Sequence, residues 1–303
     1  MKPVNRREFA AITAAGLVAG VARSAPAKAQ ETGGGMFVCM HGATGSMHDF
    51  QTTMEGWARA GIRAVEPDLP NVRQFTQRES PQAARRMLDD LGLRAVSSSN
   101  ALFLEETGPR RAQAMEDLRW KVELAEAIGA DRLVAPSAAS DSHTIDDYPE
   151  VIDNLREAAD IAAPHGVTLM VEFTRLSTLI SNLRTALMVV RAADHPNLKV
   201  MLDTFHFWSG MSKFEDLDRI ADGELHHLHF EDVPDDPPLE VFGQPDRVFP
   251  GEGIAPLDRI VEVIRSKGYA GPASLEMFSP QVRAMDPYDQ AMRARQTIEP
   301  YIL

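Results

Sequence analysis

Short apolar runs alternate with amphipathic helical stretches along most of this chain. Each run is only a few residues long and is bounded by polar or glycine-containing turns, so it predicts a strand rather than a helix. We expect eight strands, at Met36–Met40, Ile62–Glu66, Leu93–Ser97, Arg132–Ala135, Val167–Glu172, Lys199–Leu202, His226–Phe230 and Pro272–Glu276. Regular alternation of strand and helix indicates βα units and a parallel sheet.

Signals for helix ends fall between these strands. Ser80-Pro81 is an N-cap followed by proline at the first helical position. Helical patterns at Ala112–Ile128, Asp147–Ala163 and Leu257–Ser266 are each followed closely by a glycine, as expected at the turn from a helix into a strand. About eight strands with about eight helices predict an α/β protein with one (β/α)8 TIM-barrel domain. A doubly wound open sheet is the competing architecture.

Acidic and imidazole side chains stand at the ends of the last four predicted strands. Glu172 ends the fifth, Asp203 follows the sixth, His229 lies near the end of the seventh, and Glu276 ends the eighth. A carboxylate or imidazole at the end of a buried strand costs desolvation energy unless a partner compensates it. One divalent cation satisfies all four groups together, and Mn, Co, Zn or Mg suits an oxygen-rich shell with one nitrogen.

Other polar and aromatic residues near these strand ends are candidates for secondary roles. His227 and His229 point to the same face because strand side chains alternate with period two, and His229 is the better ligand candidate because it lies nearer the strand end. His206 comes three residues after Asp203, which suits a substrate contact. Trp208 stacks on a substrate or packs in the core, and the sequence leaves both interpretations open.

Composition narrows the classes of function. The formal net charge is −13, which makes nucleic acid an unsuitable partner. The single cysteine, Cys39, excludes an intramolecular disulfide and falls in an apolar run, so core packing is its expected role. We expect a small-molecule substrate, and the sequence leaves the oligomeric state, including a homo-oligomer, open.

The N-terminal segment has the features of an export signal. Asn5-Arg6-Arg7-Glu8-Phe9 precedes a weakly apolar stretch, and Ala27-Lys28-Ala29 is a small-residue cleavage site. The apolar stretch is too short to span a bilayer. We therefore expect residues 1–29 to be a twin-arginine signal peptide, residues 30–303 to form the barrel, and the mature protein to be periplasmic and not bound to the membrane. A disordered basic tail is the alternative.

The motifs from Gly166 to Glu276 resemble those of the sugar phosphate isomerase/epimerase family. The resemblance rests on Gly166–Glu172, Asp203-Thr-Phe-His206, His227-Leu-His229 and Pro250-Gly-Glu-Gly253 through Leu275-Glu276. It implies a xylose isomerase-like (β/α)8 barrel. It also implies that Glu172, Asp203, His229 and Glu276 are the metal ligands, that Glu172 and Glu276 are the catalytic acid/base pair, and that His206 holds a substrate oxygen.

Within that family, Asp246-Arg247-Val-Phe-Pro-Gly-Glu-Gly253 most resembles the inosose isomerase branch. Ketohexose epimerases carry arginine six residues after the metal histidine, where this chain has Asp235, so epimerisation of a free ketohexose is disfavoured. Endonuclease IV needs a basic groove, which the acidic charge does not suit. Arg247 is expected to contact substrate or close the site, and the alternative is an ion pair with Asp246 or Glu252.

The resemblance implies a metal-dependent isomerase or epimerase that moves a proton of a keto-sugar or keto-cyclitol through an ene-diolate. Elimination from a 3-keto-sugar or 3-keto-glycoside uses the same groups and remains an alternative. A non-catalytic sugar-binding barrel and a metal-dependent hydrolase are the readings from other classes. Because export suits free rather than phosphorylated sugars, we expect a free or oxidised sugar or a 3-keto-glycoside.

Overall fold

The computed structural model describes residues 34–99, 102 and 104–303. The predicted signal peptide, residues 1–29, therefore lies outside the described residues. These described residues form one compact unit, which agrees with a single barrel domain. In the described part of the chain, no helix has both the length and the apolar character needed to cross a bilayer.

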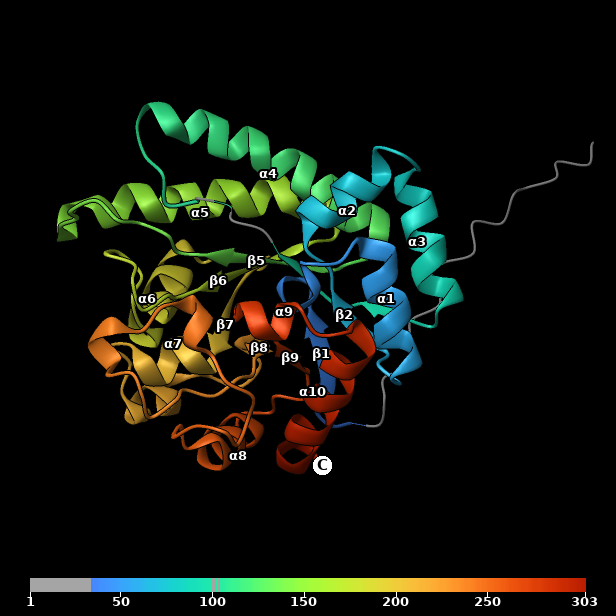
Figure 1. The fold of residues 1–303 in the computed structure, drawn as a ribbon. Helices are drawn as coiled ribbons and strands as arrows, with labels where there is room; N and C mark the ends of the chain where they lie inside the picture. Colours follow the sequence, from blue (N-terminus) through green and yellow to red (C-terminus); the bar gives the residue numbers. More distant parts are fainter. Residues whose placement is uncertain (1–33, 100–101, 103) are drawn as a thin grey trace, which may run out of the picture. The chain divides into compact units, whose positions relative to one another are not determined.

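The centre of this unit is a parallel sheet rolled into a barrel, with helices packed around its outside (Figure 1). Its strands are β1 Phe37–His41, β2 Ala64–Glu66, β3 Arg94–Ala95, β4 Ser98–Ser99, β5 Arg132–Pro136, β6 Thr168–Glu172, β7 Leu198–Asp203, β8 Leu225–His229 and β9 Pro272–Leu275. The hydrogen-bonded order is β3-β2-β1-β9-β8-β7-β6-β5-β4, so the first and last barrel positions are joined through β1 and β9. The predicted (β/α)8 TIM barrel is confirmed.

The third predicted strand, Leu93–Ser97, was wrong in its extent. The chain forms two short strands there, of which β3 pairs with β2 and β4 pairs with β5. The change of partner falls where the apolar residues of this run give way to three serines, Ser97 to Ser99, which lack the branched or aromatic bulk favoured in strands. The two pieces together occupy one of the eight barrel positions.

Helices follow the strands as the alternating pattern predicts. They are α1 Phe50–Arg59, α2 Leu69–Thr76, α3 Pro81–Asp90, α4 Pro109–Ile128, α5 Tyr148–Ala162, α6 Leu183–Ala193, α7 Thr204–Ser209, α8 Leu257–Ser266, α9 Pro280–Arg283 and α10 Pro287–Ile302. The predicted cap of α3 is confirmed, because the Ser80 hydroxyl accepts a hydrogen bond of 3.1 Å from Ala83 N. The expected helix Ala112–Ile128 begins three residues earlier, at Pro109.

A large apolar core lies between the barrel wall and the helices. Trp57 of α1 is fully buried there, and its indole N–H donates to Gln290 of α10 at 3.3 Å. Cys39 is also fully buried and packs with Ala64 and Val96, so its expected packing role is confirmed. This core packs the strands against the helices. The carboxyl ends of the strands carry polar side chains instead.

Strand register brings the polar strand ends to one level. Asp203 is the register partner of His229, and His229 is the register partner of Ser274, two residues before Glu276. On the other side, Glu172 lies beside Pro136, the last residue of β5. Because all strands run parallel, these ends meet at the carboxyl end of the barrel, where such folds place their active sites.

Candidate metal and active site

Four of the predicted side chains converge inside the carboxyl end of the barrel. One potential ligand atom from each of Glu172, Asp203, His229 and Glu276 lies within 4.8 Å of the others. His229 Nδ1 is 3.2 Å from Glu172 Oε1 and 3.3 Å from Glu276 Oε2. Its distance to Asp203 Oδ2 is 3.7 Å. All four residues are buried, so they form one compact, water-poor cluster.

Asp203 has its orientation fixed by the local backbone. It ends β7 and is the N-cap of α7, and its Oδ1 accepts a hydrogen bond of 2.7 Å from His206 N. The other oxygen, Oδ2, is therefore left to face the cluster. One aspartate thus ends the strand, starts the helix and presents a single oxygen to the site.

The second nitrogen of His229 faces a carboxylate that the sequence analysis did not select. Glu66, at the end of β2, lies 3.4 Å from His229 Nε2 through Oε1 and 3.3 Å through Oε2. The same carboxylate is 2.7 Å from His227 Nε2 and accepts from Ser274 Oγ at 3.0 Å. In the structure, His229 joins the four-residue cluster, whereas His227 pairs with Glu66.

His41, at the end of β1, is a second group absent from the predicted site. Its Nδ1 accepts a hydrogen bond of 3.0 Å from Ala43 N, so the ring proton belongs on Nε2. This Nε2 lies 3.2 Å from Glu276 Oε1 and 3.7 Å from Glu66 Oε1 without an aligned hydrogen bond among the described residues. A protonated Nε2 is a donor rather than a metal ligand, so His41 does not extend the four-residue ligand set.

Arg247 reaches the same cluster from the long loop between β8 and α8. Its Nη1 donates to Asp203 Oδ2 at 2.8 Å, lies 3.0 Å from Glu276 Oε2, and also pairs with Glu231. The guanidinium lies between the rings of Phe205 and Phe278, at 4.8 and 5.1 Å from their centroids. The expected alternative pairing with Asp246 or Glu252 is wrong, because Arg247 points inward while Glu252 pairs with Arg293.

Asp232 holds this loop in place. Its carboxylate accepts backbone hydrogen bonds from Val233, Gly251, Gly253 and Ala255, at 2.8 to 3.1 Å. Backbone hydrogen bonds in both directions also join Asp232 to Val248, the neighbour of Arg247. Gly253 is required at its position because a Cβ there would lie 2.2 Å from the Val233 carbonyl oxygen. The placement of Arg247 therefore depends on one buried aspartate and a close backbone approach.

The two remaining predicted substrate contacts differ in position. His206 is buried beside Arg247, with its Nε2 3.2 Å from Arg247 Nη2 and 3.3 Å from Gln244 Nε2. Its Nδ1 accepts from Arg175 N at 3.2 Å. Trp208 is half-buried and packs against Phe205, Val233 and Phe242, while its neighbour Phe207 belongs to the main core. The structure thus places His206 beside Arg247 at the carboxylate cluster. Trp208 instead packs against the apolar side chains of Phe205, Val233 and Phe242.

Electrostatics in the cluster are dominated by burial and by an excess of carboxylates. Burial raises the pKa of Glu172 to about 8, and Glu276 and Asp203 add to the rise. Burial also opposes ionisation of Glu276, but His41, His229 and Arg247 together lower its pKa to about 2. For Asp203 likewise, Arg247 and His206 overcome burial and hold the pKa well below its usual range. The two glutamates therefore differ in pKa, which is raised for Glu172 and lowered for Glu276 by their different surroundings.

The donor set fits a divalent cation. Five buried carboxylates gather here, on Glu66, Glu172, Asp203, Glu231 and Glu276, and Arg247 neutralises only part of their charge. Three carboxylates and one imidazole nitrogen within mutual reach match the oxygen-rich sites that bind Mn, Mg, Co or Zn. A cation at their centre would compensate the negative charge of Glu276 and Asp203, which adds to the effect of burial in raising the pKa of Glu172.

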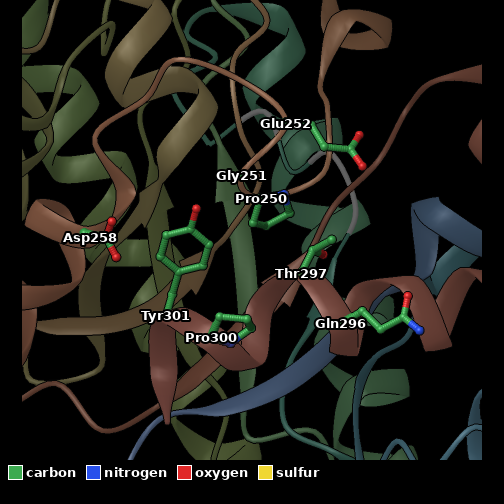
Figure 2. A pocket seen from close by; sticks show the side chains of 8 residues that line it. All are labelled: Pro250, Gly251, Glu252, Asp258, Gln296, Thr297, Pro300 and Tyr301. Carbon is green, nitrogen blue, oxygen red and sulfur yellow. The ribbon is translucent and has the colours of Figure 1, made fainter.

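A separate hollow lies on the outer side of the barrel, between the loop at Pro250–Glu252 and the C-terminal part of α10 (Figure 2). Its volume is about 470 Å³, and it is lined by Pro250, Gly251, Glu252, Asp258, Gln296, Thr297, Pro300 and Tyr301. None of the residues of the buried cluster lines it. The same loop therefore presents Arg247 inward and this hollow outward.

Three comparisons with known proteins agree with this geometry. A model of the xylose isomerase-like TIM barrel family matches residues 55–299, which is most of the chain. The chain is 26% identical over 188 residues to an inosose isomerase of Halalkalibacterium halodurans, an alignment that covers 61% of this chain and 66% of that enzyme. It is 30% identical over 239 residues to a 3-dehydroshikimate dehydratase of Pseudomonas aeruginosa, covering 76% of this chain and 36% of that enzyme.

A solved structure shows the same fold. The crystal structure of the IolI protein with a bound zinc atom superposes with a TM-score of 0.80 at 20% identity, covering 88% of this chain and 98% of that one. The chain spans just under two thirds of the inosose isomerase and about a third of the dehydratase, so their activities are not transferred to it by these matches alone. The chain belongs to the xylose isomerase-like TIM barrel family.

Proposed function

We propose that this member of the xylose isomerase-like TIM barrel family is a metal-dependent isomerase or epimerase of a keto-sugar or keto-cyclitol. The observation that carries the proposal is the convergence of Glu172, Asp203, His229 and Glu276 within 4.8 Å, from four neighbouring strands. Two of the four are glutamates, which suits a site that both holds a cation and moves a proton. The inosose isomerase relatives support a polyhydroxylated ketone as the substrate class.

Glu172, Asp203, His229 and Glu276 would hold one divalent ion. When bound, such an ion supplies Lewis-acid stabilisation of the negative charge that develops on adjacent substrate oxygens. His229 offers Nδ1, since its Nε2 faces Glu66. Asp203 offers Oδ2, because Oδ1 is engaged by the backbone of α7. The zinc atom bound in the IolI structure supports a cation in a protein of this fold without fixing the metal of this chain.

Glu172 and Glu276 are the proton-transfer pair of the proposal. They approach the cluster from β6 and from the end of β9, on either side of His229. One carboxylate removes the proton next to the substrate carbonyl, and the resulting ene-diolate receives a proton from either glutamate. Return to the opposite face gives an epimer, and return to the adjacent carbon gives an isomer.

His206 and Arg247 are the proposed substrate-binding side chains of the cluster. Burial lowers the pKa of His206 to about 4, so its imidazole is neutral at pH 7 and suited to share a hydrogen bond with a hydroxyl. The guanidinium of Arg247 carries fixed positive charge beside Asp203 and Glu276. Trp208 is proposed as a more distant apolar contact.

Elimination is the second candidate reaction, and the dehydratase relative supports it specifically. The same glutamate removes the same proton, but a β-hydroxyl or β-linked group then leaves instead of the proton returning. The leaving oxygen needs a proton, which the partner glutamate can supply in its protonated form. The two reactions therefore differ in the substrate rather than in the residues that act on it.

A substrate panel with a metal control tests the proposal. Apo protein is prepared with a chelator and reloaded with Mn, Co, Zn or Mg, then incubated in deuterated water with inososes, ketohexoses, 3-keto-glycosides and 3-dehydroshikimate. An epimer or isomer that forms only in loaded samples, with deuterium next to the carbonyl, supports the proposal, and an unsaturated product supports elimination. If the protein binds a sugar despite the chelator but forms no product, the isomerase proposal is wrong and the protein is a sugar-binding barrel. If hydrolysis products form, the protein is a hydrolase.

Export to the periplasm by the twin-arginine route is proposed from the sequence alone. The Arg6-Arg7 pair and Ala27-Lys28-Ala29 predict cleavage before Gln30, which leaves residues 30–303 as the mature enzyme. Replacing both arginines with lysine should retain the precursor in the cytoplasm. N-terminal sequencing and cell fractionation measure both points, and unchanged export of the lysine variant would refute the assignment.

A further inference from the structure

Glu66 is a fully buried carboxylate placed among three hydrogen-bond donors. It lies 2.7 Å from His227 Nε2, 3.3 Å from His229 Nε2 and 3.0 Å from Ser274 Oγ. The carboxylate is therefore a buried hydrogen-bond acceptor beside the cluster.

The two nitrogens of His229 face different partners, and this determines where its proton resides. Nδ1 faces Glu172, Asp203 and Glu276, the three carboxylates that would share a cation with it. A nitrogen that binds a cation gives its lone pair to it, so the ring proton must then be on Nε2. The acceptor within reach of that proton is Glu66.

We propose that Glu66 is a positioning residue that holds His229 in the Nε2-protonated tautomer and thereby sets the affinity of the four-residue site for its cation. The role rests on the metal centre proposed above. Carboxylates behind a metal-binding histidine fix its orientation and increase its basicity. Here the supporting carboxylate comes from β2, across the barrel from the strands β6 and β7 that carry two of the ligands.

A second cation between Glu66, His227 and His229 is the competing interpretation, because these residues also offer atoms within 4.8 Å of one another. Such a cation would take Nε2 of His229 while the first takes Nδ1, which requires an imidazolate. It would also displace the 2.7 Å contact between His227 and Glu66. With a cation on Nδ1, the hydrogen-bonded arrangement needs only a neutral His229 and leaves the contact between His227 and Glu66 in place.

Glu66→Gln is the informative substitution because it keeps the size of the side chain. An amide has one acceptor oxygen and brings an N–H₂ donor, whereas His227 and His229 each present an N–H to this position. His227, His229 and Ser274 all make their closest contact to Oε2, so an amide oxygen at that position can still accept from them. The amide nevertheless loses the negative charge behind His229, and its N–H₂ donor takes the place of Oε1, which lies 3.4 Å from His229 Nε2. We expect the dissociation constant for Co²⁺ or Zn²⁺ to rise about 10–100-fold, the range found when such supporting partners are removed.

Glu105→Gln is the matched control. Glu105 is also a buried carboxylate, but it accepts from Ser137 Oγ and Ala138 N, and within the described part of the chain it forms no hydrogen bond or ion pair with the four cluster residues. Both variants replace a buried glutamate by its amide, so a loss of Co²⁺ affinity confined to Glu66→Gln cannot come from that change alone. The d–d absorption of the Co²⁺-loaded protein should change in Glu66→Gln and stay as in wild type in Glu105→Gln.

Imidazole ¹⁵N resonances of the Zn²⁺-loaded wild type provide a test that does not depend on the Glu66 variant. The His229 signal, assigned by its loss in His229→Gln, should show a protonated Nε2 and a metal-bound Nδ1. A protonated Nδ1, or a Glu66→Gln protein with wild-type affinity and Co²⁺ spectrum, would overturn the role of Glu66. If the wild type binds neither ion, the proposed metal centre itself is wrong.

Discussion

The two halves of the barrel carry the same residue types at their strand ends but use them differently. In β6 to β9, Glu172, Asp203, His229 and Glu276 turn their polar atoms toward one another. In β1 and β2, His41 and Glu66 turn theirs toward residues of the other half, at 3.2 Å from Glu276 and 3.3 Å from His229. Strands β6 to β9 thus supply the four-residue cluster, whereas β1 and β2 supply side chains that contact it from outside.

This difference teaches how one kind of residue acquires two roles. A strand-end carboxylate with a free side toward the barrel axis is available to a cation or substrate. A strand-end carboxylate whose oxygens already accept from His227, His229 and Ser274 is not, and it acts only through those partners. Contacts, rather than residue type or strand position, separate the two groups, and substitutions in each half should therefore give different signatures.

The largest expected effect comes from the second half. Asp203→Ala removes one cluster oxygen and the cap of α7, and it leaves Arg247 with one carboxylate fewer. Even supporting partners are worth about 10–100-fold in metal affinity, so loss of a ligand should cost at least about a hundredfold. Elemental analysis and Co²⁺ titration measure this loss. If Asp203→Ala kept its full metal content, Asp203 would not be a metal ligand. The proposed difference between the two halves of the barrel would then be wrong.

Removal of the proton-transfer pair should affect rate more than metal content. Glu172→Gln and Glu276→Gln keep the volume and one oxygen but remove the base, so kcat should fall by about a hundredfold or more in each. Bound metal is measured on the same samples, because metal loss is the competing cause. Deuterium exchange next to the substrate carbonyl should disappear in parallel. Two variants with metal and full activity would leave this pair without a proton-transfer role.

Much of this centre was predictable from the sequence because the signal is local. Glu172 and Glu276 each follow a short apolar run, and Asp203 and His229 fall at the end of the next such runs, so parallel strands alone bring them together. Glu66 carries the same signal, as the last residue of the predicted strand Ile62–Glu66, and His41 directly follows Met36–Met40. Applying the strand-end criterion to the first half would have found both.

The rest of the site depends on contacts that no local pattern encodes. Arg247 lies in an irregular loop, and its inward direction follows from the four backbone hydrogen bonds that Asp232 accepts. Glu231 is one residue past an apolar strand position, and only its pairing with Arg247 marks it. The break between β3 and β4 likewise arises from pairing with different neighbours, which hydrophobic periodicity along one segment does not report.

A smaller effect should follow from changing the first half at His41. Its Nε2 lies 3.2 Å from Glu276 Oε1, so His41→Gln should disturb the orientation of Glu276 but leave the cation ligands in place. We expect kcat to fall roughly tenfold, less than the roughly hundredfold or more expected for a group that transfers the proton itself, with metal affinity within a few-fold of wild type. Metal loss comparable to that of Asp203→Ala would instead make His41 a ligand and place it with the second half.

The smallest effect should come from the second half itself, on the outer side of the loop that carries Arg247. Glu252 lines the outer hollow (Figure 2). It forms an ion pair with Arg293, and both side chains are about 40% exposed. Exposed pairs contribute about 0.2–1 kcal/mol, so Glu252→Ala should lower the free energy of unfolding by no more than that, as measured by urea denaturation. Its kcat and metal affinity should equal those of wild type, because Asp232 binds the backbone of this loop and not the Glu252 side chain. A loss of activity in Glu252→Ala would mean that the loop's outer contacts also set the position of Arg247. Residues that support the cluster would then lie on the outer side of this loop as well as on strands β1 and β2.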